Sequence, residues 1–149
     1  MEDADPRPAP NEPAAPVAAC AVEVDMGRPG LAAEEIPTTL PVHEGAVRLS
    51  LGGRQLQLGV VSMGNPHAVL LAEEWPEPMN DAAMAELGKT ISAHAAFPEG
   101  CNVGFARIAA PDRIELHVHE RGSGPTRACG SGACAAAVYA RRLGRVGDS

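Results

Sequence analysis

Cys129 precedes a Gly-Ser-Gly-Ala segment and is the residue best suited to chemistry. A helical pattern begins just after Cys129, so we expect its thiol at a helix N-terminus. The unpaired backbone N–H groups and the positive end of the helix dipole favour a thiolate there. The same N–H groups can hold a carboxylate. Cys129 is therefore the candidate for a reactive thiol, and a small buried side chain is the alternative that composition leaves open.

Three other patterns in the same region are interpreted as structural. Cys134 lies more than one turn into the helix, so we expect an inert core side chain. Residues 130–135 match the G-x-G-x-x-A spacing of dinucleotide sites, but they follow a polar loop where a strand is required. Ser131 lacks the flanking glycines of a nucleophile elbow. We exclude both of these sites.

His117 and His119 are two residues apart in an expected strand and so share one of its faces. Such a pair could bind a metal ion with a third ligand. A partly exposed sheet face is the interpretation that we favour, so no metal site is predicted.

The hydrophobic pattern predicts a scaffold of strands and helices for these residues. Period-two alternation predicts six strands, at residues 21–26, 47–51, 55–61, 68–71, 103–108 and 114–118. One helix is expected to begin after Asn80, which can cap it, and to end near His94, and a second helix spans residues 131–143. The Gly52-Gly53 dipeptide predicts a tight hairpin, because both central positions of such a turn need positive φ.

The order of these elements predicts an α+β fold. The dense alanines of the last helix would let strands approach it on several sides, as a curled sheet around a central helix requires. Residues 63–67 interrupt the strand pattern and place polar side chains on a loop at the edge of the sheet, where a ligand could bind.

Composition separates a tail from a single domain. Residues 1–20 are rich in proline, alanine and acidic residues, with too little apolar surface to offset chain ordering, so we expect a disordered tail or linker. Residues 21–149 are expected to form one domain.

Charge and cysteine usage exclude several classes of partner. The formal net charge of −7 and a pI near 5.1 argue against nucleic acid and anionic membranes as partners. The sequence has no apolar run long enough to span a membrane and no pattern of a secretory signal, so we expect a cytoplasmic protein. The spacing of the four cysteines fits neither a zinc site nor a disulfide scaffold, and free thiols are expected.

Four segments have distinctive amino-acid sequences. They are Val-Asp-Met-Gly-x-Pro at residues 24–29, Val-Ser-Met-Gly-Asn-Pro-His at 61–67, Phe-Pro-Glu-Gly-Cys-Asn-Val-Gly-Phe at 97–105, and Glu-Arg-Gly-x-Gly-x-Thr-x-Ala-Cys-Gly-Ser-Gly-Ala-Cys-Ala at 120–135. Together and in this order they closely resemble diaminopimelate epimerase. The resemblance runs from about Val22 to Gly147 and matches the second half of that family.

The resemblance implies a fold and an activity. Members of the family have two similar α+β domains, each a curled mixed or antiparallel sheet around a central helix, with the active site between them. The implied reaction is the interconversion of LL- and meso-diaminopimelate in lysine and peptidoglycan biosynthesis, without pyridoxal phosphate or another cofactor. Two cysteines on opposite faces of the substrate α-carbon carry it out, one as a thiolate base and one as a thiol acid.

By the same resemblance, Cys129 is one of the two catalytic cysteines. Residues at the substrate-contacting positions of the family are Asn65, Asn102, Glu120, Arg121, Gly130 and Ser131. His67 and Glu120 match residues that tune the thiols. Turn and strand-border roles remain alternatives for Asn65 and Asn102, since asparagine is also common at such positions.

The sequence departs from the family pattern in two ways. Pro125 replaces a usual Glu in the Glu-Arg-Gly-x-Gly-Glu-Thr motif, and the first domain with its own catalytic cysteine has no counterpart here. Neither Cys20 nor Cys101 lies in a matching motif. The main hypothesis is therefore half of an epimerase, a truncated product or split gene, that works with an N-terminal half or with a second copy. A catalytically silent, stand-alone domain that binds amino-acid carboxylates is the alternative, while relatives of proline racemase or phenazine-pathway isomerases fit fewer of the motifs.

Overall fold

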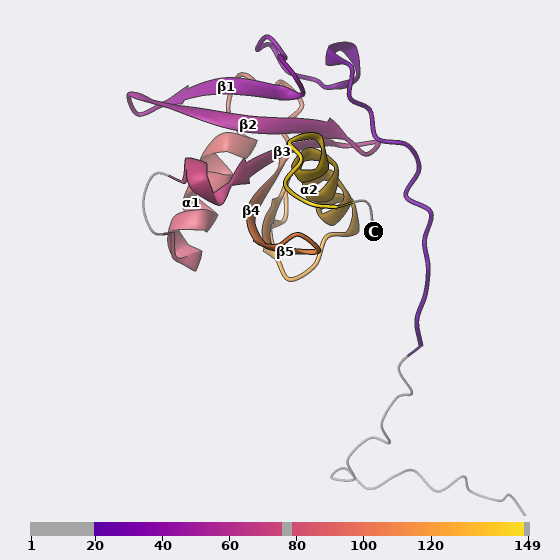
Figure 1. Ribbon diagram of the computed structural model, residues 1–149. Coiled ribbons are helices and arrows are strands. Elements are labelled where there is room, and N and C mark those ends of the chain that lie inside the picture. Colours follow the sequence, from indigo (N-terminus) through magenta and orange to yellow (C-terminus); the bar gives the residue numbers. More distant parts are fainter. Residues whose placement is uncertain (1–19, 76–78, 148–149) are drawn as a thin grey trace, which may run out of the picture.

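The computed structural model describes residues 20–75 and 79–147. The expected disordered tail lies, apart from Cys20, outside the described residues. Within the described ranges the chain forms a sheet and two α-helices, which confirms the α+β class (Figure 1). No helix in these ranges combines the length and the apolarity that crossing a bilayer requires.

The described residues form six strands, two α-helices and two 3₁₀ turns. The strands are β1 (Ala46–Leu51), β2 (Arg54–Ser62), β3 (Pro66–Leu71), β4 (Asn102–Ala110), β5 (Arg113–Glu120) and β6 (Gly124–Thr126). The α-helices are α1 (Asp81–Ser92) and α2 (Gly130–Arg142), and two 3₁₀ turns are η1 (Ala33–Glu35) and η2 (Ala72–Glu74).

The six strands form one mixed sheet whose spatial order is the same as the chain order. Neighbouring strands are antiparallel except β3 and β4, which are parallel because α1 connects them as a crossover. The sheet is open, with β1 and β6 at its edges. In the parallel register His67 of β3 lies beside Asn102 of β4.

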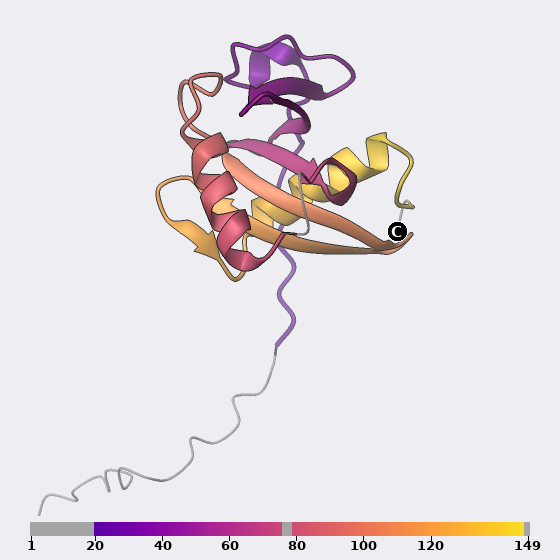
Figure 2. The same cartoon turned by 90° about the vertical axis from the view of Figure 1, so that its left-hand side faces the viewer.

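Each face of the sheet carries one α-helix (Figure 2). On β3, Ala68 and Leu70 pack into the cluster that includes α1 residues, whereas Val69 and Leu71 pack into the cluster that includes α2 residues. α2 contacts β2, β3, β4 and β5. It therefore takes the place of the expected central helix, although the open sheet covers only one side of it.

α2 lies close to the sheet because small residues face it. A Cβ atom on Gly59 of β2 would come within 2.2 Å of the Tyr139 ring, so only glycine leaves room for the ring. Ala135 and Ala136 are 0% and 1% exposed. The aromatic ring of Tyr139 thus packs directly on the backbone of the sheet, and its hydroxyl is 3.3 Å from Gln57 Nε2.

Several predicted local features are confirmed. Gly52 and Gly53 form the β1–β2 turn with φ of 55° and 77°. Asn80 caps α1, because its Oδ1 accepts a hydrogen bond of 2.8 Å from the Ala83 N–H. The final helix ends at Arg142, within one residue of the predicted end.

Three predictions about strands are wrong. Residues 21–26 belong to no strand, because nothing among the described residues pairs with them. Pro66 and His67 begin β3, although they were expected in the loop before it. β6 was missed, because its sequence Gly-Pro-Thr is typical of a turn and has no strand pattern of its own, although it pairs with the end of β5.

Candidate functional site

Cys129 is the N-cap of α2, as the sequence predicted. Its backbone is extended, with φ −144° and ψ 106°, and its Sγ accepts a hydrogen bond of 3.4 Å from the Gly132 N–H. The Ser131 Oγ lies 3.6 Å from the same sulfur. Cys129 is half-buried, so part of the residue is open to solvent.

The first turn of α2 offers two backbone donors beside this sulfur. Gly130 and Ser131 precede the first residue whose N–H can bond within the helix, and their N–H groups have no acceptor among the described residues. Gly132 keeps this turn close to β5, since a Cβ there would lie 3.2 Å from Val118 Cγ2 and from the Cys129 sulfur. A thiol and two free donors therefore face the same small region, which suits a carboxylate.

A second group of polar side chains lies at one end of the sheet. His67 and Asn102 begin β3 and β4, and Glu120 ends β5, which runs in the opposite direction. Their neighbours Val69, Ala106 and Leu116, an even number of positions away, belong to the α2 cluster. The three polar side chains therefore point to the α2 face.

Hydrogen bonds hold this group in place. The His67 Nε2 is 3.0 Å from Asn65 Oδ1, and the Asn102 Oδ1 accepts a bond of 2.8 Å from the Arg121 N–H. Asn65 thus reaches the group from the loop before β3. The predicted substrate residues Asn65, Asn102, Glu120 and Arg121 are all found at this end of the sheet.

Thr126 is a residue that sequence reasoning did not assign to the site. Its Oγ1 donates a hydrogen bond of 2.7 Å to Glu120 Oε1. Thr126 is paired with Val118 in β6 and lies three residues before Cys129, so it joins the polar group to the loop that carries the thiol. Its place in the Glu-Arg-Gly-x-Gly-x-Thr motif was the available signal.

His67 is uncharged at neutral pH. It is 2% exposed, and burial lowers its pKa to about 4, although the negative charge of Glu120 raises it in part. The ring therefore acts as a neutral hydrogen-bonding group.

Arg121 is exposed and is oriented by its own loop. Its Nη1 donates a hydrogen bond of 2.7 Å to the carbonyl oxygen of Glu99. Its side chain passes over Gly100, where a Cβ would lie 2.9 Å from Arg121 Cδ. The guanidinium thus lies against the Glu99–Gly100 loop and keeps further donors for a ligand.

The other cysteines are in different surroundings, and all four are free thiols, as predicted. Cys101 is fully buried, and burial raises its pKa to about 12 although Arg121 opposes the shift. Cys134 is half-buried on α2, more than one turn after Cys129. Cys20 is exposed. In the described residues, Cys129 alone combines a helix N-terminus with access from solvent.

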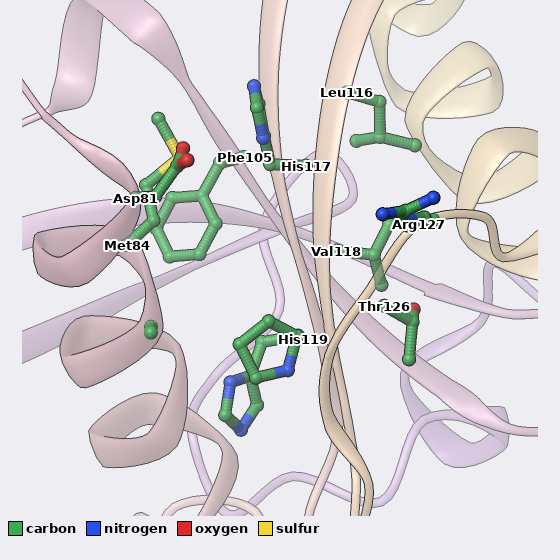
Figure 3. A pocket seen from close by; sticks show the side chains of 11 residues that line it. Asp81, Met84, Phe105, Leu116, His117, Val118, His119, Thr126 and Arg127 are labelled. Carbon is green, nitrogen blue, oxygen red and sulfur yellow. The ribbon is translucent and has the colours of Figure 1, made fainter.

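A pocket of about 390 Å³ lies beside α1 and does not include Cys129 (Figure 3). His117 and His119 line it, on the same side of β5 as Phe105. Burial lowers the pKa of His119, and the charge of Lys89 lowers it further. Across the described ranges no three His, Cys, Asp or Glu side chains are grouped as metal ligands.

Comparison with known proteins gives a consistent result. A family model described as "Diaminopimelate epimerase" matches residues 59–149. Proteins named diaminopimelate epimerase are similar over most of the chain. The protein of Halorhodospira halophila is 49% identical over 120 residues, which is 80% of this chain and 40% of the relative. That of Caulobacter sp. (strain K31) is 48% identical over 127 residues, and that of Xylella fastidiosa 48% over 126, each 83% of this chain and 43% of the relative.

The chain belongs to the diaminopimelate epimerase family. The matched region contains Cys129, the polar group at the end of the sheet and both helices. The chain spans about two fifths of the length of these curated relatives. Diaminopimelate epimerases are isomerases, so the chain belongs to a family of enzymes.

Proposed function

We propose that this chain is the half of a diaminopimelate epimerase that carries the proton-accepting thiol, Cys129. The observation that supports it best is the position of Cys129 at the N-cap of α2, next to the free N–H groups of Gly130 and Ser131. In this proposal the complete enzyme works in the cytoplasm, in lysine and peptidoglycan biosynthesis, without a cofactor.

The proposed site holds the substrate at its reacting end. The N–H groups of Gly130 and Ser131 bind the α-carboxylate, and the positive end of the α2 dipole stabilises its charge. Asn65, Asn102 and Arg121 supply further polar contacts from the neighbouring rim. These contacts fix the α-carbon beside the Cys129 sulfur.

The proposed proton transfer follows from this position. The Cys129 thiolate takes the α-proton and becomes a thiol, while the electron pair of the C–H bond stays on the α-carbon and spreads into the bound carboxylate. A second thiol then gives a proton to the opposite face of the carbon and becomes a thiolate. The configuration at the α-carbon is inverted, and no electron is gained or lost overall.

Neither Cys101 nor Cys134 is placed to be the second thiol. Cys101 is sealed in the core and keeps its proton, because burial raises its pKa to about 12. Cys134 lies on the same helix as Cys129, so it cannot face it across a bound α-carbon. We infer that an N-terminal half, as in the longer relatives, supplies it.

In this proposal, neutral His67 and Glu120 together adjust the reactivity of the catalytic thiols. Glu120 is held by a hydrogen bond from Thr126, and His67 by one with Asn65.

Pro125 is tolerated because β6 is an edge strand, where a missing N–H costs no sheet hydrogen bond on its open side.

The test measures conversion of LL- to meso-diaminopimelate and uptake of deuterium at the α-carbon from D₂O. We expect no conversion by the purified chain alone, because only one face of the carbon has a positioned group. Adding an N-terminal half that carries the partner cysteine should restore conversion. The variant Cys129→Ser keeps an N-cap side chain and should abolish it, whereas the matched control Cys134→Ala should retain it.

Two outcomes would contradict this proposal. Steady conversion by the chain alone, lost in Cys129→Ser, would mean that a second copy or another thiol completes the pair. Tight binding of diaminopimelate with no deuterium uptake, even after an N-terminal half is added, would favour the alternative of a silent carboxylate-binding domain.

A further inference from the structure

Thr126 and Glu120 lie on the same face of the β5–β6 pair. In the antiparallel register Thr126 is opposite Val118, and Glu120 is two residues further along β5. Side chains two residues apart in a strand share a face, and a diagonal pair across two strands is close enough for long side chains to meet. Figure 3 shows Val118 and Thr126 on the α2 side of β5 and His119 on the α1 side. Thr126 and Glu120 therefore meet on the α2 face of the sheet.

The contact between these two residues is a charge-assisted hydrogen bond. Thr126 Oγ1 donates to Glu120 Oε1 over 2.7 Å. Both residues are half-buried, so water weakens the bond less than it would at the open surface. In the described part of the chain, Oε2 of Glu120 has no hydrogen-bond partner. One carboxylate oxygen is thus held in place, while the other remains an acceptor for a ligand.

The turn between β5 and β6 has its own support and does not need this bond. The Ser123 N–H donates a hydrogen bond of 3.2 Å to the Glu120 carbonyl oxygen, and Gly122 and Gly124 have φ of 83° and 80°. Strand pairing then continues as far as Thr126. The backbone and the glycines therefore form the turn, and the Thr126 hydroxyl fixes the carboxylate side chain.

Threonine is well suited to hold a glutamate. Its β-branched side chain is restricted at χ1, so the hydroxyl has few alternative positions. Glu120 has several rotatable bonds, and ordering them costs side-chain entropy. Because Thr126 orders the carboxylate before a ligand arrives, that cost is not taken from ligand binding.

The position of the Glu120 charge affects the rest of the site. Burial lowers the pKa of His67 to about 4, and the charge of Glu120 raises it in part, so the carboxylate interacts with this imidazole. Thr126 also lies three residues before Cys129 in the chain. A carboxylate that left its place would therefore change the electrostatics around the polar group at the end of the sheet.

We propose that Thr126 is a positioning residue for the epimerisation: its hydroxyl fixes the Glu120 carboxylate before the substrate binds, so that Oε2 is presented to a hydrogen-bond donor of the substrate. This inference rests on the proposed function of the Cys129 site. Thr126 itself does not touch the substrate. Without its hydroxyl, Glu120 samples other rotamers, and a smaller fraction of the molecules has the geometry that the reaction needs.

Kinetics of the complete enzyme, formed with an N-terminal half, test this inference on LL-diaminopimelate. Thr126→Val keeps the β-branched shape without the hydroxyl and should lower kcat/KM at least about tenfold. Thr126→Ser restores a hydroxyl and should stay within about threefold of the wild type, a rescue that a merely loosened loop would not show. The control Thr90→Val removes a hydroxyl that bonds the Glu86 carbonyl on the exposed face of α1, and should have no effect.

Urea unfolding of the chain alone tests the hydrogen bond without any activity. Thr126→Val and Glu120→Ala should each lower the urea midpoint, and the double variant should lower it by less than the sum of the two, because both remove the same bond. Fully additive shifts would overturn the inference.

The two measurements separate failure of this inference from failure of the proposed function. An active wild-type enzyme in which Thr126→Val is equally active, or in which Thr126→Ser is as impaired as Thr126→Val, would overturn the role of Thr126 and leave the proposed function standing. A wild-type enzyme that stays inactive with the N-terminal half would contradict the proposed function, and with it this inference, whatever unfolding shows about the bond.

Discussion

On the α1 face of the sheet the core is built mainly from large aliphatic and aromatic side chains, whereas on the α2 face glycine and alanine make room for one large ring, Tyr139. Leu49, Leu58 and Phe105 are at most 1% exposed on the first face. On the second, Gly59 and Ala135 let α2 approach the backbone of the sheet. The first arrangement mainly contributes apolar burial, and the second fixes the position of one helix, and with it Cys129.

The largest effect is expected from adding one methyl group on the α2 face. In Gly59→Ala the new Cβ would lie within about 2.4 Å of several Tyr139 ring atoms, so α2 must move. We expect a loss of at least about 3 kcal/mol of unfolding free energy and an altered rate of Cys129 alkylation. Urea unfolding and timed alkylation with peptide mapping measure the two effects. The control Gly147→Ala has open space around it and should be neutral, while a loss under about 1 kcal/mol for Gly59→Ala would contradict the close packing.

A large-to-small change on the α1 face should act differently. Leu58 is 0% exposed, so Leu58→Ala should cost about 2–4 kcal/mol by leaving a cavity. The alkylation rate of Cys129 in the folded protein should stay unchanged, because Leu58 packs on the other side of the sheet. An alkylation change as large as that of Gly59→Ala would show that the two faces are not independent.

A smaller effect is expected from the pH dependence of His67. Its pKa is about 4 in the folded chain and near 6.5 when exposed, so the unfolded state binds more protons between these values. Stability from His67 is therefore fully present above pH 6.5 and is lost as the pH falls towards 4, by at most about 3 kcal/mol. Urea unfolding at several pH values should show a steeper slope in the wild type than in His67→Gln, where the lowered pKa of His119 still contributes a slope of the same sign. The variant His43→Gln removes an exposed imidazole and should keep the slope.

Local sequence signals predicted the features that depend on neighbours in the chain. Gly52-Gly53 predicted the hairpin because positive φ is a property of the residues themselves. Asn80 predicted the start of α1 because its side chain bonds the N–H three residues later. The place of Cys129 at the N-cap of α2 followed from the change from a glycine-rich loop to a helical pattern.

Features that depend on which segments pair as strands could not be found in this way. β6 exists because Gly124–Thr126 lies beside the end of β5, and Gly-Pro-Thr has no strand pattern of its own. Conversely, the alternation in residues 21–26 is typical of a strand, but no partner lies beside it in the described chain. A strand pattern states which side chains could be buried, not whether a neighbouring strand is present.

The sequence by itself determined the family, the α+β class and the thiol at a helix N-terminus. Motifs, periodicity and capping signals are patterns of residues that lie close together in the chain. The tertiary structure alone decided which residues meet. The parallel pairing of β3 with β4 set His67 beside Asn102, and the bond from the Arg121 N–H to Asn102 Oδ1 tied the end of β5 to that pair. The physical reason is that these contacts join segments far apart in the chain, and their geometry is fixed only when the sheet assembles and buries both of its faces.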